Sequence, residues 1–112
     1  MATMDQCIKA LEGILGDLAK NPAAAGLDRS LSCRLTDLDQ VVLGRLNSGA
    51  VRDLHAVPDG PSVPRADIRL TMTSDDVVSL TTGKLHFGQA WMSGRVKLEA
   101  GLRDVLRLRK LL

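Results

Sequence analysis

Aromatic residues are almost absent from this sequence, which has no Tyr, one Trp and one Phe. Proteins that bind single-stranded nucleic acid usually stack the bases on several aromatic side chains. The formal net charge of +2 is also too small to indicate a polyanionic partner. Four basic residues near the C-terminus are typical of a solvated helix face, so we expect no nucleic-acid partner. They are Arg103, Arg107, Arg109 and Lys110.

Cysteine and histidine are also scarce, with two residues of each. Cys7 and Cys33 form no CxxC pair, which excludes the usual zinc-ligand spacing and a dense disulfide framework. No carboxylate or cysteine is spaced to make His55 or His86 a metal ligand or a general base. The sequence displays no nucleophile, base and oxyanion site. We therefore predict no catalytic residue, no metal and no cofactor, and a protein that is not an enzyme.

The sequence lacks a long apolar run, and none approaches the length that crosses a bilayer. Near its start, Asp5 comes before any basic residue, which does not fit a signal peptide. The final residues read Arg-Lys-Leu-Leu and do not match the Ser-Lys-Leu peroxisomal address. We therefore expect a reducing, cytoplasmic location.

What the sequence does contain is enough apolar residue for one core. Its 112 residues, 45% hydrophobic and 25% charged, predict a single domain over residues 1–112. The clearest helix is predicted over residues 4–19, where Thr3 and Gln6 have the spacing of a capping box at its start. The apolar face of this helix comprises Met4, Cys7, Ile8, Leu11, Ile14, Leu15 and Leu18.

Alternation of apolar and polar residues predicts strands after this helix. Residues 27–37 alternate in this way, and residues 40–46 and 50–57 are weaker candidates separated by an Asn-Ser-Gly turn. We predict a three-stranded meander. The clearest strand covers residues 66–73, and its buried face would comprise Ala66, Ile68, Leu70 and Met72.

The remaining residues predict short helices and one more strand. Ser74, Asp75 and Asp76 bring capping and acidic residues into the first turn of a helix. The expected elements are a helix from Ser74 that stops at Gly83, a brief helix over 87–92 that Gly94 ends, a strand over 96–99 and a helix over 102–112.

The second half of the chain resembles a known family. The segments that carry the resemblance are Ala66-Asp67-Ile68-Arg69-Leu70-Thr71-Met72, Ser74-Asp75-Asp76, Thr82-Gly83-Lys84-Leu85, Ala90-Trp91-Met92-Ser93-Gly94 and Arg95-Val96-Lys97-Leu98-Glu99. In order and spacing they resemble the sterol carrier protein type two domain. The resemblance implies an α+β fold, in which helices cover a five-stranded, mostly antiparallel sheet and enclose an apolar cavity. It also implies non-catalytic binding and transfer of an apolar lipid such as a sterol, a fatty acid or an acyl chain.

The last predicted helix gives a separate physical indication. Its apolar residues cover more than half of its circumference, which exceeds the stripe needed to cover one sheet. Such a helix is either fully buried or lies between the sheet and a ligand, another chain or a membrane surface. With the resemblance, we favour the ligand. The apolar residues are Leu102, Val105, Leu106, Leu108, Leu111 and Leu112.

Arg109 lies inside this apolar sector. Either its side chain reaches out to water and complements the helix C-terminus, or it is a cation at the cavity mouth that meets a carboxylate or phosphate of the ligand. Trp91 and Met92 stand at the apolar pair of the family, where they line the cavity, pack in the core, or do both. The candidate ligand-binding residues are Val77, Leu80, Leu85, Phe87, Trp91, Met92, Leu102, Val105, Leu106 and Arg109.

The alternative function is a protein-interaction or dimerisation module that uses the apolar C-terminal helix. The expected partner is a lipid or sterol-like small molecule, with transient membrane contact and a homodimer as further hypotheses. Sterols, fatty acids, acyl-CoA and quinone precursors all stay open as ligands, because an aliphatic cavity discriminates chain length by only about 1 kcal/mol per methylene.

Overall fold

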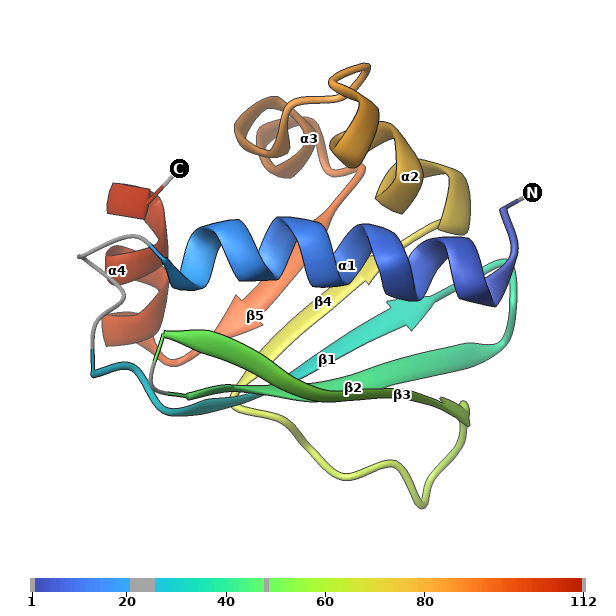
Figure 1. Ribbon diagram of the computed structural model, residues 1–112, viewed down its shortest axis with the longest axis horizontal. Helices are drawn as coiled ribbons and strands as arrows, with labels where there is room; N and C mark the ends of the chain where they lie inside the picture. The colour runs from blue at the N-terminus through green and yellow to red at the C-terminus, as the bar shows by residue number, and fades with distance from the viewer. Residues whose placement is uncertain (1, 21–25, 48, 112) are drawn as a thin grey trace.

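The computed structural model describes residues 2–20, 26–47 and 49–111, with side chains described up to residue 106. Within these residues, four helices and five strands form an α+β domain (Figure 1). Their order along the chain is α1 (Met4–Ala19), β1 (Arg29–Leu35), β2 (Gln40–Asn47), β3 (Ala50–Pro58), β4 (Ile68–Met72), α2 (Ser74–Thr82), α3 (Phe87–Ser93), β5 (Lys97–Ala100) and α4 (Leu102–Leu111).

The first helix forms as its sequence predicts. The Thr3 side chain accepts a hydrogen bond from the backbone N–H of Gln6, whose own side chain accepts one from the backbone of Thr3. This reciprocal pair satisfies two N–H groups at the helix start. The helix lies across one face of the sheet (Figure 1). Its buried residues are Cys7, Ala10, Leu11, Leu15 and Ala19.

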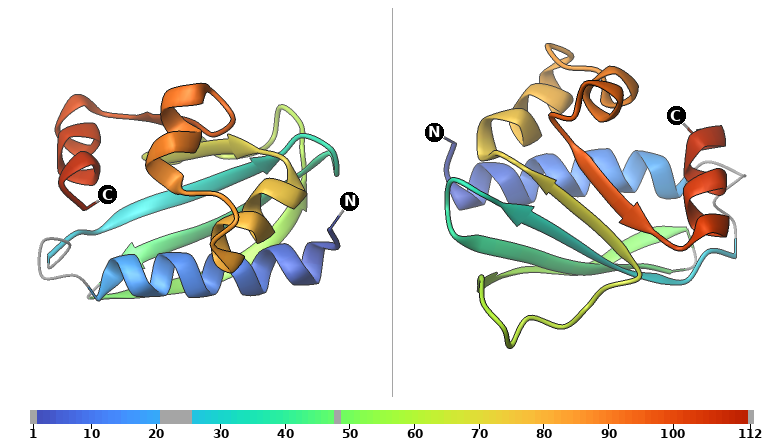
Figure 2. Two further views of the ribbon diagram at one scale, coloured as in Figure 1. Left: turned by 90° about the horizontal axis from the view of Figure 1, so that it is seen from above. Right: turned by 180° about the vertical axis from the view of Figure 1, so that it is seen from behind.

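The five strands form one sheet in the order β3-β2-β1-β4-β5. The pairs β1–β2, β2–β3 and β4–β5 are antiparallel, and β1 and β4 are parallel. The predicted meander and the mostly antiparallel sheet are therefore confirmed. Since β4 lies beyond β1, the 59–67 connection must cross β2 and β1, and it does so on the face opposite α1 (Figure 2).

The two central strands present apolar residues to the helices at every second position. Leu31, Cys33 and Leu35 in β1 are buried, as are the matching residues of β4. In the parallel register these form three rows, which are Leu31 beside Ile68, Cys33 beside Leu70 and Leu35 beside Met72. The core is therefore aliphatic, as the shortage of aromatic residues predicts.

Both cysteines are free and buried in this core. Burial, together with the nearby Cys7 thiol, raises the pKa of Cys33 to about 12. Burial also raises the pKa of Cys7, with smaller contributions from Asp37 and Asp75. Because the thiolate is the reactive form, both residues behave at neutral pH as small apolar side chains.

The start of α2 is fixed by polar contacts that the sequence pattern did not predict. Thr73, expected to be the last strand residue, is the N-cap of α2 and accepts a hydrogen bond from the backbone N–H of Asp76. The fully buried Ser74 donates to the Asp37 carboxylate from its backbone N–H at 2.9 Å and from its hydroxyl at 2.5 Å. The Ser74 hydroxyl in turn accepts from the backbone N–H of Ala2. These bonds join the β1–β2 turn, α2 and the start of the chain.

We predict that Ser74→Ala lowers the free energy of unfolding by about 1–2 kcal/mol at pH 7, because it removes a buried hydroxyl that bonds on both sides. Desolvation opposes ionisation of Asp37, but the hydrogen bonds from Ser74, together with a bond from the backbone of Asp37 itself and the N-terminal charge, outweigh it and hold the pKa of Asp37 below its usual value. A lowered folded-state pKa stabilises the fold at neutral pH, and that contribution is lost as the pH falls through it.

The gap in stability between wild type and Ser74→Ala should therefore shrink as the pH falls below about 4, the usual pKa of an Asp carboxyl group. Urea unfolding at several pH values measures it. Ser79→Ala on the same helix is the matched control and should change stability little, since the Ser79 hydroxyl forms no hydrogen bond within the described residues and only its carbonyl accepts bonds. A gap that is constant with pH would refute the role given to Asp37.

Candidate functional site

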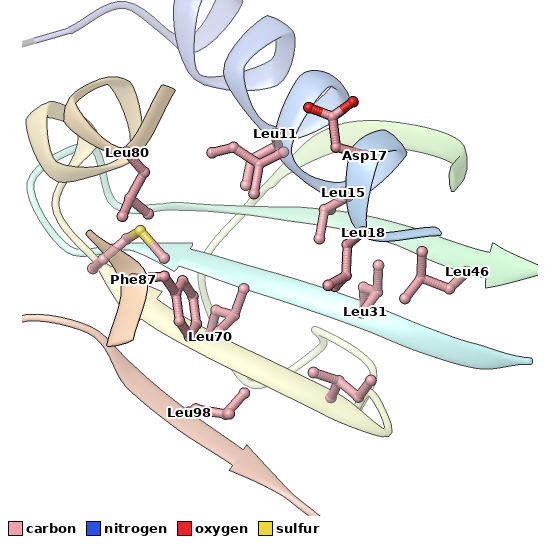
Figure 3. Close-up of a pocket in the computed structure, with 13 residues that line it drawn as sticks. Leu11, Leu15, Asp17, Leu18, Leu31, Leu46, Leu70, Leu80, Phe87 and Leu98 are labelled. Carbon is pink, nitrogen blue, oxygen red and sulfur yellow. The ribbon is translucent and has the colours of Figure 1, made fainter. Parts of the chain in front are cut away.

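The candidate site is a hollow of about 290 Å³ between α1 and the sheet (Figure 3). The sheet supplies its floor, α1 its roof, and α2 and α3 contribute one residue each at one end. Twelve of its thirteen lining residues are apolar, so it excludes charged groups from its interior. The lining residues are Leu11, Ile14, Leu15, Asp17, Leu18, Leu31, Leu46, Ile68, Leu70, Met72, Leu80, Phe87 and Leu98.

The hollow lies under the second half of α1. Toward the other end of this helix, the small residues Cys7 and Ala10 are buried in the core. Further along, Leu11, Leu15 and Leu18 recur at helical spacing and point toward the strands from one side (Figure 3). The hollow is therefore a space that the apolar stripe of α1 borders without filling.

Asp17 is the single polar residue of this lining. Its side chain is exposed, and its carboxylate points away from the leucines of the hollow (Figure 3). It thus marks a place where the apolar wall meets water. A negative charge here disfavours a second carboxylate nearby and tolerates an uncharged or cationic group.

Two of the ten predicted site residues line the hollow. Leu80 comes from α2 and Phe87 from α3, and both lie at the end of the hollow remote from Asp17 (Figure 3). Val77 is fully buried in the core, and Leu85 packs against the core at its edge. Trp91 is half-buried and meets the Phe87 ring edge to face, with ring centroids 6.4 Å apart.

The other predicted residues lie outside this lining. Met92 is 92% exposed, and in α4 Leu102 is 76% and Leu106 51% exposed, while Val105 is half-buried. The side chain of Arg109 lies outside the described residues.

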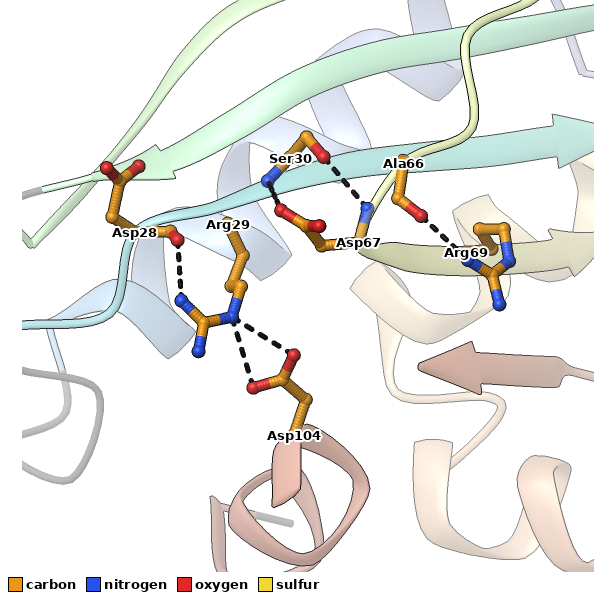
Figure 4. Close-up of polar contacts among 7 residues, drawn as sticks. All are labelled: Asp28, Arg29, Ser30, Ala66, Asp67, Arg69 and Asp104. Atoms are coloured by element: carbon orange, nitrogen blue, oxygen red, sulfur yellow. Dashed lines mark hydrogen bonds and ion pairs between the residues drawn. The ribbon is translucent and has the colours of Figure 1, made fainter. Parts of the chain in front are cut away.

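The position of α4 explains the exposure of its leucines. This helix follows β5 directly and stands at the end of the sheet where β1 and β4 begin (Figure 2). Asp104 in its first turn accepts two hydrogen bonds from Arg29 Nε, at 3.0 and 3.2 Å (Figure 4). Arg29 also donates to the Asp28 carbonyl at 2.8 Å. This ion pair, with Asp104 largely shielded from solvent, holds the first turn beside β1 and away from the hollow.

Sequence reasoning assigned most of the lining to the core and not to a ligand site. The hydrophobic pattern identified Ile68, Leu70 and Met72 as inward-facing, and they are buried. A hydrophobic pattern of period two or 3.6 shows which side of a strand or helix faces inward, whereas a hollow depends on the distance between the helix layer and the sheet. No signal in the sequence distinguishes a filled core from a core that contains a hollow.

Other kinds of site find little support. Among the residues that the structure describes, no group of three or more His, Cys, Asp or Glu side chains is placed to hold a metal ion. No described helix combines the length and the apolar character needed to cross a membrane.

A five-stranded α+β sheet that holds an apolar hollow beneath its first helix defines a class of domain suited to apolar ligands. A family model described as the SCP-2 sterol transfer family matches residues 8–112. The chain therefore belongs to this family, whose domains bind or transfer lipids and are typically non-catalytic.

Solved structures share the fold. A crystal structure of sterol carrier protein 2 has a TM-score of 0.63 at 20% identity, with 96% of this chain and 88% of that chain covered. The solution structure of palmitated SCP2L2 from Aedes aegypti has a TM-score of 0.61 at 16% identity, with 98% and 94% covered.

Among curated proteins, the chain is similar to the human hydroxysteroid dehydrogenase-like protein 2. The two are 36% identical over 53 residues, which are 47% of this chain and 13% of the human protein. The mouse protein gives 36% identity over 56 residues, 50% of this chain and 11% of that protein. The chain thus spans only about an eighth of the length of these relatives.

Trp91 provides a reporter for the hollow, because it is the only Trp and no Tyr competes with its fluorescence. It contacts Phe87, which lines the hollow, but is not itself part of the lining. We predict that a fatty acid with a nitroxide in mid-chain quenches Trp91 saturably but incompletely, since Trp91 contacts a lining residue without lining the hollow itself.

Unlabelled fatty acid should reverse this quenching when it is added to the complex with the labelled one. Added alone to the protein, the unlabelled fatty acid controls for changes in emission that binding itself causes. Saturable binding by calorimetry with an unresponsive Trp91 would contradict the placement of the ligand beside Phe87.

Proposed function

We propose that this chain binds one apolar chain of a lipid in the hollow between α1 and the sheet, without catalysis, and passes it on to an acceptor. The observation that carries the proposal is the lining itself, in which twelve of thirteen residues are apolar and the thirteenth, Asp17, is exposed to solvent. An apolar space that is open to ligand is the usual form of a small-molecule site.

The volume of the hollow favours a slender ligand. At about 290 Å³ it lies at the lower end of the range of roughly 300–1,000 Å³ found for ligand pockets. A single acyl chain suits this space better than a broad ring system. The palmitated form of the Aedes aegypti neighbour supports an acyl chain as ligand in this fold.

The expected affinity follows from the buried methylenes. At about 0.8 kcal/mol for each CH₂, a sixteen-carbon chain contributes on the order of 10 kcal/mol before the costs of ordering and association, which consume several. We therefore expect a dissociation constant in the micromolar range or below for long-chain lipids.

We predict that Leu18→Phe combined with Leu98→Phe weakens palmitate binding at least tenfold, because the larger side chains occupy the hollow. The same variant should be as stable as wild type or more so, since filling a cavity commonly adds about 0.5–2 kcal/mol. Calorimetry below the micelle threshold and thermal unfolding are the two measurements.

Leu106→Phe, on the exposed part of α4, is the matched control and should leave binding unchanged. If wild type shows no saturable binding of palmitate or a sterol, lipid binding is refuted as the function. The alternative, an interaction or dimerisation surface formed by the exposed leucines of α4, would then be favoured.

The negative charge of Asp17, in the lining of the hollow, predicts that the head group of the lipid affects its affinity. We predict that Asp17→Asn strengthens binding of dodecanoate several-fold while leaving dodecanol unchanged, because about 1 kcal/mol of repulsion between two nearby solvated charges is removed. Glu12→Gln, an exposed residue of α1 outside the lining, is the matched control.

Displacement of a fluorescent fatty acid measures the affinities of wild type, Asp17→Asn and Glu12→Gln for dodecanoate and for dodecanol. An equal change for the acid and the alcohol would show that Asp17 acts on packing and not through its charge.

A further inference from the structure

A second hollow, of about 420 Å³, lies on the opposite face of the sheet. The 59–67 connection crosses β2 and β1 on this face and supplies one wall (Figure 2). In contrast to the hollow under α1, its lining is rich in polar and charged groups. The lining residues are Ser32, Arg34, Val41, Gly60, Val63, Pro64, Arg65, Arg69, Leu70, Thr71 and Glu99.

The parallel pairing of β1 and β4 sets the floor of this second hollow. Ser32 is paired with Arg69 and Arg34 with Thr71, at positions that alternate with the buried residues of each strand. Two guanidinium groups and two hydroxyl groups therefore share one small patch of the outer face. The third guanidinium, that of Arg65, comes from the crossing connection.

Positive charge exceeds negative charge in this lining, which holds three arginines and one carboxylate, that of Glu99. Arg34 forms an ion pair with Asp59 at 3.0 Å, while the Arg69–Glu99 pair is longer, at 3.8 Å. Within the part of the chain that the structure describes, no ion pair is recorded for Arg65.

Arg69 is held in place by the backbone. One of its terminal nitrogens donates to the Ala66 carbonyl at 2.8 Å, and its side chain is half-buried (Figure 4). The reciprocal bonds between Ser30 and Asp67, at 2.8 and 3.1 Å, fix the end of the crossing connection against β1. The floor and the wall of the hollow are thus positioned before any ligand arrives.

We infer that this second hollow is a binding site for a phosphate group, carried by a soluble phosphomonoester or by a lipid head group. Guanidinium groups present paired N–H donors that match phosphate oxygens, and the Ser32 and Thr71 hydroxyls add further donors. The three arginines come from three parts of the chain, which are β1, β4 and the crossing connection, and they line one hollow. An anion that lies between like charges gathered in this way offsets their repulsion. This site is separate from the hollow of the proposed function and does not depend on it.

Two substitutions with opposite expected effects test the inference. Arg65→Gln should weaken binding of glycerol 3-phosphate at least fivefold, because it removes a charge-assisted donor. Glu99→Gln should strengthen it severalfold, because it removes a competing carboxylate. Arg52→Gln, which removes an exposed arginine outside the lining, is the matched control and should change nothing.

Titration of ¹⁵N-labelled protein with glycerol 3-phosphate measures the affinity and shows where it binds. Shifts should concentrate in residues 32–34 and 63–71 and leave α1 unmoved. If the amide signals of these residues show no saturable chemical-shift change, or if Arg65→Gln and Arg52→Gln lose the same affinity for glycerol 3-phosphate, the inference is overturned.

Cosedimentation with phosphatidylcholine vesicles that contain phosphatidic acid distinguishes the two sources. Binding that Arg65→Gln reduces and glycerol 3-phosphate displaces supports a lipid head group. Saturable binding of glycerol 3-phosphate without vesicle binding supports a soluble phosphomonoester. Palmitate calorimetry on Arg65→Gln should match wild type, so a failure of this inference is separable from a failure of the proposed function.

Discussion

The parallel pairing of β1 with β4 at the centre of the sheet is the constraint on which the rest of the structure depends. It aligns Leu31, Cys33 and Leu35 with the apolar residues of β4 and so builds the floor beneath α1. It also places β4 beyond β1, which forces the connection from β3 across the outer face. The return from β4 to β5 then runs through α2 and α3 on the helix side. Both hollows follow from this one pairing, since the crossing connection walls one of them and the α2–α3 return closes an end of the other.

Local elements of the fold could be predicted from the sequence because their causes are local. The Thr3–Gln6 capping box and the apolar stripe of the first helix lie within residues that are neighbours in the chain, and the helix begins where they indicate. The strand alternation likewise gave the correct buried faces. The strand before α2 ends one residue earlier than predicted, since alternation continues through Thr73 but its side chain caps α2. The bond from Ser74 to Asp37, which is 37 residues away, adds a contact at this boundary that no local pattern reports.

The candidate site could be predicted only in part, because a hollow is a property of spacing between layers. Leu80 and Phe87 line it. The resemblance also pointed to Trp91, which contacts Phe87 without lining the hollow, and to Met92, which is exposed to solvent. The apolar sector of the last helix is evident in the sequence, but Leu102 and Leu106 in it are exposed. The position of this helix depends on the ion pair between Arg29 and Asp104. That pair joins residues 75 apart in sequence, and no local pattern reports it.

The shared strands couple the two hollows in a way that affects how any substitution is interpreted. In β4, Ile68 lines the apolar hollow and the next residue, Arg69, lines the polar one, while Leu31 and Ser32 do the same in β1. A change of strand register by one residue would exchange these faces and destroy both linings at once.

An unfilled apolar hollow also leaves its lining short of packing contacts, and a ligand that fills it stabilises the folded state by mass action. Because the same two strands form both floors, stability gained from one ligand also maintains the arginine geometry of the other face. If a substitution in the apolar hollow weakens phosphate binding, the first explanation is therefore a disturbed sheet, and coupling between the two ligands comes second.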